Sequence, residues 1–80
     1  MRTVYLLRSV TDATRRHVGS TDDLRRCLTD HNAGRAIATA AFRPWRVVVA
    51  VVFQDDARAV AFEHYLDSGT GAEFARRHFW

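Results

Sequence analysis

Hydrophobic and polar residues alternate along the chain in a pattern that predicts six short elements. Three runs rich in Val, Leu, Tyr and Phe are typical of strands, and three stretches with apolar residues every three or four positions favour helices. The strands are expected at about residues 3–7, 15–19 and 45–53, and the helices at about 22–31, 55–67 and 70–79. This order predicts an α+β fold, a three-stranded antiparallel sheet flanked by three helices, in one domain over residues 1–80.

The first two strand runs are separated by a polar, turn-like segment at residues 11–14, so they are expected to pair as a hairpin. The third run, residues 45–53, is apolar on both of its faces. This run is the strongest strand signal in the sequence, and we expect the strand to be covered on both sides.

The helices carry recognisable start and stop signals. Cap candidates at residues 20–23 precede the first helix, and Gly34 follows it as a natural stop. One face of this helix is expected to carry the following residues: Leu24, Cys27, Leu28 and His31.

The two later helices are less clearly patterned. In the second, the inward face is expected to carry the following residues: Ala57, Val60, Ala61, and His64 or Tyr65. Thr70 with Glu73 three residues later predicts a capping box at the start of the last helix.

Composition narrows the function classes. With 48% hydrophobic residues and one Pro, the chain is expected to fold rather than remain a disordered tail. A single cysteine, Cys27, allows no internal disulfide, and no apolar run approaches the ~20 residues of a membrane span. We therefore expect a soluble cytoplasmic protein with no leader. All twelve basic residues are Arg, which suits phosphate contacts but is also what a GC-rich genome encodes.

Five blocks of residues carry a resemblance to a known family. They follow one another in order and with the family's spacing: residues 3–5, 17–24, 31–32, 43–45 and 61–71. Together they resemble the GIY-YIG endonuclease family, in its small stand-alone bacterial type, and are similar to the N-terminal nuclease domain of the bacterial excision-repair endonuclease. The last block, Phe-Glu-His-Tyr-Leu-Asp-Ser-Gly, is the most specific.

The resemblance implies hydrolysis of a phosphodiester bond with one divalent ion, usually Mg²⁺, with Mn²⁺ as an alternative. The expected substrate is nucleic acid, DNA rather than RNA, in a role such as DNA repair. Glu63 stands at the metal-binding position, Tyr5 at the first signature Tyr, and His31 at a His that the family often carries. A hard carboxylate for the metal and a proton acceptor near the nucleophile are what this chemistry requires. His31 equally suits the negative end of a helix dipole.

Two catalytic positions depart from the family pattern. His17 replaces the second signature Tyr, and its imidazole, which titrates near ~6.5, is able to accept a proton at neutral pH. Cys27 replaces the catalytic Arg and supplies no positive charge, a loss expected to cost on the order of a thousandfold in rate. Arg26 is adjacent, but one residue is a turn of about 100° around a helix, so Arg26 is expected to point away. Ala41 and Asp67 stand where related sequences tend to carry Lys.

These departures leave several readings open. The chain is either an active nuclease or a degenerate module that binds nucleic acid or a partner. A third possibility is a small scaffold that neither cuts nor binds nucleic acid. His17, Cys27, His31 and Glu63 are a donor set suited to zinc, but their spacing is not a local zinc motif, and the sequence favours Cys27 as a small buried apolar residue beside Leu24 and Leu28. A Cys27–His31 nucleophilic pair lacks a readable oxyanion site.

Arginines are the expected substrate contacts. The rim of the site is predicted to carry the following residues: Arg15, Arg16, Arg25, Arg26, Arg35, Arg43 and Arg46. Trp45 and Phe42 would then be available for base stacking. The alternative is a solvated arginine face with both aromatics in the core.

Overall fold

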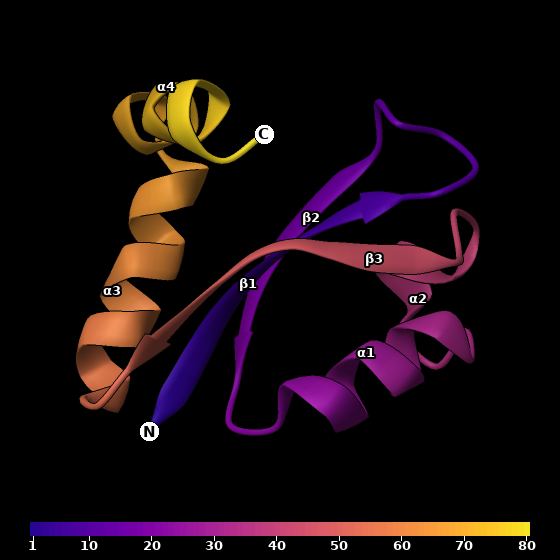
Figure 1. Ribbon diagram of the computed structural model, residues 1–80, viewed down its shortest axis with the longest axis horizontal. Coiled ribbons are helices and arrows are strands. Elements are labelled where there is room, and N and C mark those ends of the chain that lie inside the picture. Colours follow the sequence, from indigo (N-terminus) through magenta and orange to yellow (C-terminus); the bar gives the residue numbers. More distant parts are fainter.

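A three-stranded antiparallel sheet with the strand order β2-β1-β3 lies at the centre of the computed structural model, which describes all 80 residues (Figure 1). The fold class predicted from the sequence is confirmed, with four helices in place of three. The elements are β1 (Arg2–Ser9), β2 (Arg16–Thr21), α1 (Leu24–Asn32), α2 (Ile37–Ala40), β3 (Trp45–Phe53), α3 (Asp56–Asp67) and α4 (Gly69–His78).

The central strand is β1, and it pairs on both sides. The predicted hairpin is confirmed, since β1 pairs antiparallel with β2 in a register that sets Tyr5 opposite Gly19 and Leu7 opposite His17. On its other edge β1 pairs antiparallel with β3, with an irregularity between Leu6 and Leu7. Four consecutive β1 residues, 4–7, are buried because both neighbours and both faces of this strand are covered.

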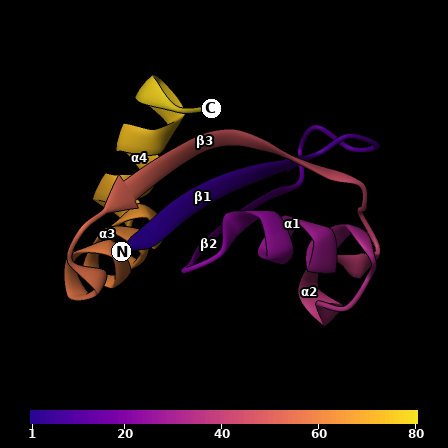
Figure 2. The same cartoon turned by 60° about the horizontal axis from the view of Figure 1, so that its bottom comes forward.

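The two faces of β1 belong to two separate hydrophobic clusters. Val4 and Leu6 pack with residues of α3 and α4, among them Leu66 and Ala75. Tyr5 and Leu7 lie on the opposite face because successive strand residues alternate. There they pack with Trp45 and are covered by the following residues of α1: Leu24, Cys27 and Leu28. Figure 2 shows α1 and α2 on one side of the curved sheet and away from α3 and α4.

The expectation that the strand at residues 45–53 is covered on both sides is wrong. Beyond Trp45, β3 has no buried residue, and Val52 is 59% exposed. The reason is strand order, since β3 is an edge strand and β1 takes the central place. Local hydrophobicity does not specify which strand lies in the middle.

The predicted apolar face of α1 is confirmed. Asp23 caps the helix by accepting a hydrogen bond from the Arg26 backbone N–H at 3.0 Å. Gly34 ends it with a φ of +79°, a left-handed conformation that glycine adopts without strain.

The inward face predicted for the second helix is wrong. Ala57, Val60, Ala61, His64 and Tyr65 are all exposed. The face of α3 that packs on the sheet carries Ala59, Phe62, Glu63 and Leu66, at positions i, i+3, i+4 and i+7. Apolar and charged residues occur on every side of this helix, so the stripe is faint in the sequence.

The capping box predicted at Thr70 and Glu73 is also wrong. Ser68 caps α4 by accepting a hydrogen bond from the Gly71 backbone N–H at 3.2 Å. Glu73 instead pairs with Arg76 and Arg77 along the helix surface. No helix of the structure has the length and apolar character needed to cross a membrane.

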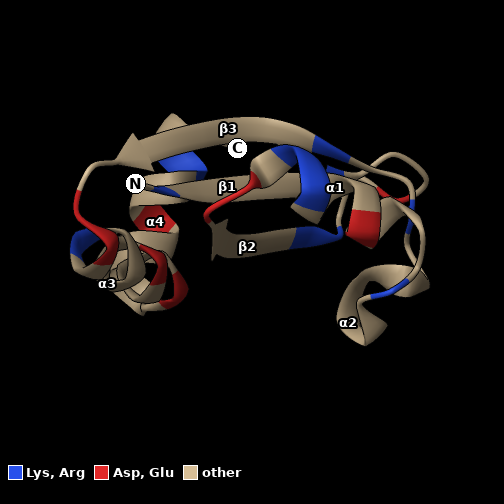
Figure 3. Cartoon of the chain, turned by 90° about the horizontal axis from the view of Figure 1, so that it is seen from below, with Lys and Arg blue, Asp and Glu red and all other residues tan.

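Charged residues are unevenly distributed over the fold. Figure 3 shows residues of both signs on α3 and α4, and acidic residues on the loops that lead into α3 and into α1. Basic residues mark α1 and the ends of β2 and β3 that lie away from α3. The end of the sheet that lies away from α3 is therefore the basic end of the molecule, whereas α3 and α4 carry charges of both signs.

Candidate active site

The phenol of Tyr5 lies across the neighbouring strand β2. A Cβ added to Gly19 would lie 2.5 Å from the Tyr5 hydroxyl oxygen, too close for any side chain. Glycine at this position therefore lets the phenol pass over β2 toward the sheet edge. The glycine of the Val18-Gly19 pair in β2 is therefore needed to leave room for the Tyr5 hydroxyl group.

A directed chain of hydrogen bonds starts from that hydroxyl. The Cys27 S–H donates to Tyr5 Oη at 3.1 Å, and Tyr5 Oη lies 3.1 Å from His31 Nε2. On the far side of the ring, His31 Nδ1 lies 2.7 Å from Thr39 Oγ1, whose hydroxyl donates to the Ala36 carbonyl. These directions are mutually consistent only if Tyr5 donates to Nε2 and Nδ1 carries the imidazole proton.

His31 is buried within this hydrogen-bonded chain, with 6% of its surface exposed, as are Tyr5 and Thr39. Burial lowers the pKa of its imidazole, and the nearby Asp30 carboxylate opposes that shift. The ring is therefore neutral at pH 7, as the chain of donors requires. This argues against the alternative role of His31, as a charged partner for the negative end of the α1 dipole, because a neutral ring carries no charge for the helix end to stabilise.

His17 adjoins the same cluster from β2. Its ring centroid lies 5.0 Å from that of His31 and 6.1 Å from that of Tyr5. None of the hydrogen bonds within the cluster involves His17, so both of its ring nitrogens are free of partners there. Burial lowers the pKa of His17, as does the neighbouring His31, while Glu63 and Asp67 raise it.

Glu63 is half-buried on the inward face of α3. It takes part in none of the ion pairs of the molecule. Its charge nevertheless acts on Tyr5 and on His17. The pKa of Tyr5 is raised above its usual 10, chiefly by burial, then by Cys27 and Glu63. The carboxylate of α3 and the phenol of β1 therefore belong to one neighbourhood.

A family model of the GIY-YIG catalytic domain matches residues 1–75 of the chain. The chain belongs to the GIY-YIG family. It is 43% identical over 68 residues to the structure-specific endonuclease subunit SLX1 of Scheffersomyces stipitis, a match that covers 76% of this chain and 20% of that protein. It is 37% identical over 70 residues to the SLX1 subunit of Candida dubliniensis, which covers 79% and 24% respectively.

The chain spans about a fifth to a quarter of the length of these two curated relatives. Both relatives are fungal, and the bacterial type expected from the sequence stays a prediction.

The donor set of this GIY-YIG domain fits a divalent ion held by a single protein carboxylate. Glu63 is half-buried without a cationic partner, so its oxygens are available to a hard cation. Mg²⁺ is commonly held by one or two carboxylates together with water and substrate phosphates. Zinc prefers several nitrogen and sulfur ligands at once, and the structure contains no group of three or more His, Cys, Asp or Glu able to hold a metal. The zinc alternative weighed from the sequence is therefore not supported, whereas the other interpretation of Cys27, as part of the apolar face of α1, agrees with its packing beside Leu24 and Leu28.

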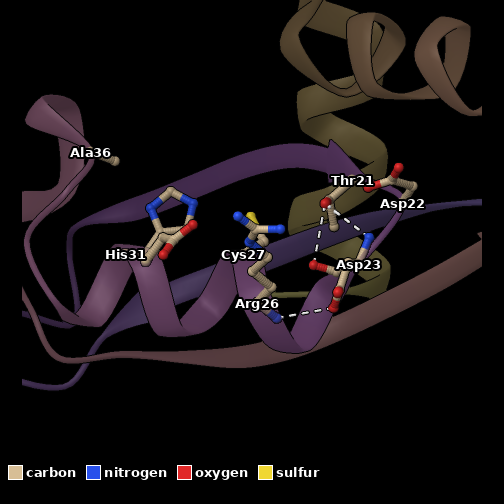
Figure 4. A pocket seen from close by; sticks show the side chains of 8 residues that line it. Thr21, Asp22, Asp23, Arg26, Cys27, His31 and Ala36 are labelled. Atoms are coloured by element: carbon tan, nitrogen blue, oxygen red, sulfur yellow. Dashed lines mark hydrogen bonds between the residues drawn. The ribbon is translucent and has the colours of Figure 1, made fainter.

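Cys27 lies between Tyr5 and an open hollow of about 440 Å³ (Figure 4). The hollow is lined by residues of the β2–α1 loop, α1 and the start of α2: Thr21, Asp22, Asp23, Arg26, Cys27, Asp30, His31 and Ala36. The expectation that Arg26 points away from Cys27 is wrong, because both line this hollow, and Figure 4 shows the Arg26 side chain directed along α1 toward Cys27. The long, flexible side chain of Arg26 reaches this hollow even though its Cα is rotated by about 100° from that of Cys27 around the helix.

Of the arginines expected at the rim, only Arg26 lines this hollow. Arg15 stacks on Phe42 at 4.3 Å, and Arg16 lies over the Trp80 ring at 4.9 Å. Arg43 packs against Gly34. Trp45 is buried and donates its indole N–H to the Thr39 carbonyl at 2.8 Å, so its expected role in base stacking is wrong.

Arg35 is tied to Asp30 in an ion pair, and Arg46 borders a different hollow. Arg25 is exposed on α1.

Thr39 and Asn32 are the residues of the site that sequence reasoning missed as contributors. Thr39 lies on α2, a helix hidden in the expected loop, and is 1% exposed. Asn32 fixes the start of β3 by pairing with both the N–H and the C=O of Trp45. Thr39 stands in an alanine-rich segment whose sequence does not indicate a functional residue. Asn32, by contrast, belongs to the His31-Asn32 block on which the family resemblance rests.

Proposed function

We propose that this chain is the catalytic domain of a metal-dependent endonuclease that hydrolyses phosphodiester bonds in structured DNA. The observation that carries the proposal is the GIY-YIG match over residues 1–75, in which the Tyr5 and His17 rings adjoin at 6.1 Å and Glu63 forms no ion pair. These groups come from three different elements, β1, β2 and α3, so only the fold brings them together.

His17 is the general base in this proposal. Its imidazole has free ring nitrogens, and its lowered pKa keeps it neutral at pH 7, so a ring nitrogen is able to take a proton from the attacking water. Tyr5 has the opposite property, since its raised pKa keeps the phenol protonated. The Tyr5 hydroxyl therefore orients the water through its oxygen while its own proton is held by His31 Nε2.

Glu63 would hold the divalent ion, and when bound this ion supplies positive charge to the crowded phosphate oxygens. Arg26 adds a second positive charge from the wall of the hollow, where Cys27 supplies none. The activity expected of this site is therefore weaker than that of a domain with Arg at position 27, because Arg26 reaches the hollow from a neighbouring position.

The names of the two relatives refine the substrate. Both are described as structure-specific endonuclease subunits, so we infer a branched or otherwise structured DNA substrate and an association with another protein. DNA repair and a cytoplasmic location stay predictions. The basic end of the molecule, with Arg residues on α1 and on the sheet, is consistent with a polyanionic substrate.

A binding module that has lost cleavage is the second candidate. The Cys27 S–H is occupied by a hydrogen bond to Tyr5 and leaves no cation at that point of the site. Under this reading the chain still binds DNA through its arginines but does not cut it.

Cleavage of labelled linear and branched DNA in Mg²⁺, in Mn²⁺ and in EDTA distinguishes the two candidates. We expect divalent-dependent cleavage by the natural sequence and its loss in Glu63→Gln. Glu73→Gln is the matched control, because Glu73 is an exposed carboxylate on α4 that pairs with Arg76 and Arg77. Equal activity in Glu63→Gln and the natural protein contradicts the proposal.

The double variant His17→Tyr, Cys27→Arg completes the experiment by restoring the two residues that the family carries. Cleavage by this variant alone favours the binding module.

A further inference from the structure

Three arginines form a row across the sheet, on the face opposite the Tyr5 site. The strand register sets Arg8 directly opposite Arg16 on β2 and directly opposite Arg46 on β3. Residues that face each other in this way project to the same side of a sheet. Arg8 follows Val4 and Leu6 by even steps, so the row lies on the face that packs against α3 and α4, at its uncovered basic end.

This arrangement is unfavourable in the absence of an anion. Neighbouring strands are about 4.8 Å apart, and like charges directly opposite each other destabilise a sheet. None of the six ion pairs involves any of the three arginines. Trp80 partly compensates two of them, since its ring lies 5.8 Å from the Arg8 guanidinium and 4.9 Å from that of Arg16. Arg46 has no such contact and is exposed.

A hollow of about 260 Å³ opens at one end of this row. It is lined by Arg8, Ser9, Val10, Ala13 and Arg46, and it is separate from the hollow beside Cys27. Arg8 donates to the Trp80 carbonyl at 2.9 Å, but its Nε–H is shielded from water and has no acceptor. The guanidinium groups that the row offers to a ligand with several acceptor oxygens are therefore the exposed ones of Arg16 and Arg46, with the half-buried Arg8 between them.

We propose that Arg8, Arg16 and Arg46 form a second nucleic-acid contact, which binds backbone phosphates away from the bond that is cut. Guanidinium groups match phosphate oxygens in geometry and charge. This inference rests on the proposed function and adds to it a surface on the other side of the sheet. A contact of this kind engages part of a structured substrate outside the active site and contributes to affinity rather than to the chemical step.

The test compares two variants with the same change in net charge. Arg16→Gln/Arg46→Gln alters the row, whereas Arg58→Gln/Arg77→Gln removes two exposed arginines outside the row, which pair with Asp55 and Glu73. Binding of labelled branched DNA is measured by fluorescence polarisation in EDTA over a series of salt concentrations. Thermal melts establish that all proteins are folded.

We expect the row variant to bind about tenfold more weakly and to lower the salt slope by about two, one for each lost phosphate contact. In cleavage assays its KM rises while its kcat is unchanged. Equal weakening by both variants, or unchanged binding by the row variant beside DNA binding by the natural protein, overturns the inference and leaves the proposed function standing.

Absence of DNA binding by the natural protein overturns both proposals. The last part of the experiment uses inorganic phosphate as the ligand. Stabilisation of the natural protein but not of the row variant by phosphate, with identical DNA binding by the two, would assign the row to free phosphate and contradict a nucleic-acid contact.

Discussion

The two faces of β1 differ more than any other two regions of the molecule. On one face Val4 and Leu6 lie in an apolar cluster with α3 and α4, with no polar side chain among its buried members. On the other face Tyr5 shares its hydroxyl with Cys27 and His31, and the hydrogen bonds continue to Thr39 on α2. Because successive side chains of a strand point to opposite faces, neighbouring residues of β1 belong in turn to an apolar, stabilising face and to a polar face.

This contrast suggests that stability and chemistry are distributed over different elements. The dry face, the one with Val4 and Leu6, joins the sheet to α3 and α4 chiefly by apolar burial, with a hydrogen bond from Arg8 to the main chain of Trp80 beside it. The polar face holds buried hydrogen-bonding groups, which are costly to leave unpaired and therefore fix a particular arrangement. Substitutions on the first face should alter the free energy of unfolding, and those on the second should alter catalysis as well.

Leu6→Ala is expected to give the largest effect, on the dry face. Leu6 is fully buried, so its truncation should lower the free energy of unfolding by about 2–5 kcal/mol through lost burial and a cavity. Urea denaturation measures this change. Leu24→Ala, at a half-buried position of the other cluster, is the comparison and should cost less. An equal or larger loss for Leu24→Ala would break the contrast between the faces.

Cys27→Arg is expected to give the next largest effect, on the polar face. A guanidinium at this position lies on the wall of the hollow and adds positive charge for the phosphate, so kcat should rise at least about tenfold. Single-turnover cleavage measures the gain. Cys27→Ser supplies no charge and should give none, and a similar gain in both variants would refute the electrostatic explanation.

Tyr5→Phe removes one oxygen from the polar face. Cys27 and the buried His31 each lose a hydrogen-bonding partner, and we expect a loss of about 1–2 kcal/mol in the free energy of unfolding. Tyr65→Phe, which removes a hydroxyl from an exposed position of α3, should change stability little. Indistinguishable denaturation curves for Tyr5→Phe and the natural protein would mean that the hydrogen-bond chain does not contribute to stability.

The smallest effect expected is a pH dependence that also arises on the polar face. The pKa values of His17 and His31 are lowered from the ordinary 6.5, so the unfolded chain binds protons at pH values where the folded protein does not. Stability is then full above pH 6.5 and falls as the pH drops toward the folded-state values.

Urea denaturation at pH 7.5 and 5.5 measures this difference. His17→Gln should reduce it and His64→Gln, on the exposed side of α3, should preserve it. A protein that is more stable at pH 5.5 would contradict the assigned direction.

Much of the fold was predictable because its strands and first helix are specified by local patterns. The hairpin, the extent of residues 45–53 and the apolar face of α1 all follow from periods of two and 3.6 residues. The strand order does not, since the central position of β1 depends on pairing between segments far apart in the chain. The inward face of α3 was hidden because small alanines occur on all its sides.

The candidate site was predictable through the resemblance, and its geometry only through the fold. The charge of Glu63 contributes to the raised pKa of Tyr5 because α3 packs on the sheet, which no local pattern indicates. Arg16 is a different case, since it directly precedes His17 on a strand and must project from the opposite face. If the alternation of side chains along the strand had been applied strictly, Arg16 would not have been expected at the rim of the active site.

The central claim is that Glu63 and Tyr5 share a site that accepts a divalent cation, and Mn²⁺ titration followed by NMR tests it most directly. Paramagnetic Mn²⁺ broadens resonances close to the bound ion. We predict saturable broadening of the backbone amide signals of Glu63, Tyr5 and His17 in the natural protein and its loss in Glu63→Gln. Broadening that persists in Glu63→Gln, or that falls on Glu73 and Asp55 instead, would contradict the account.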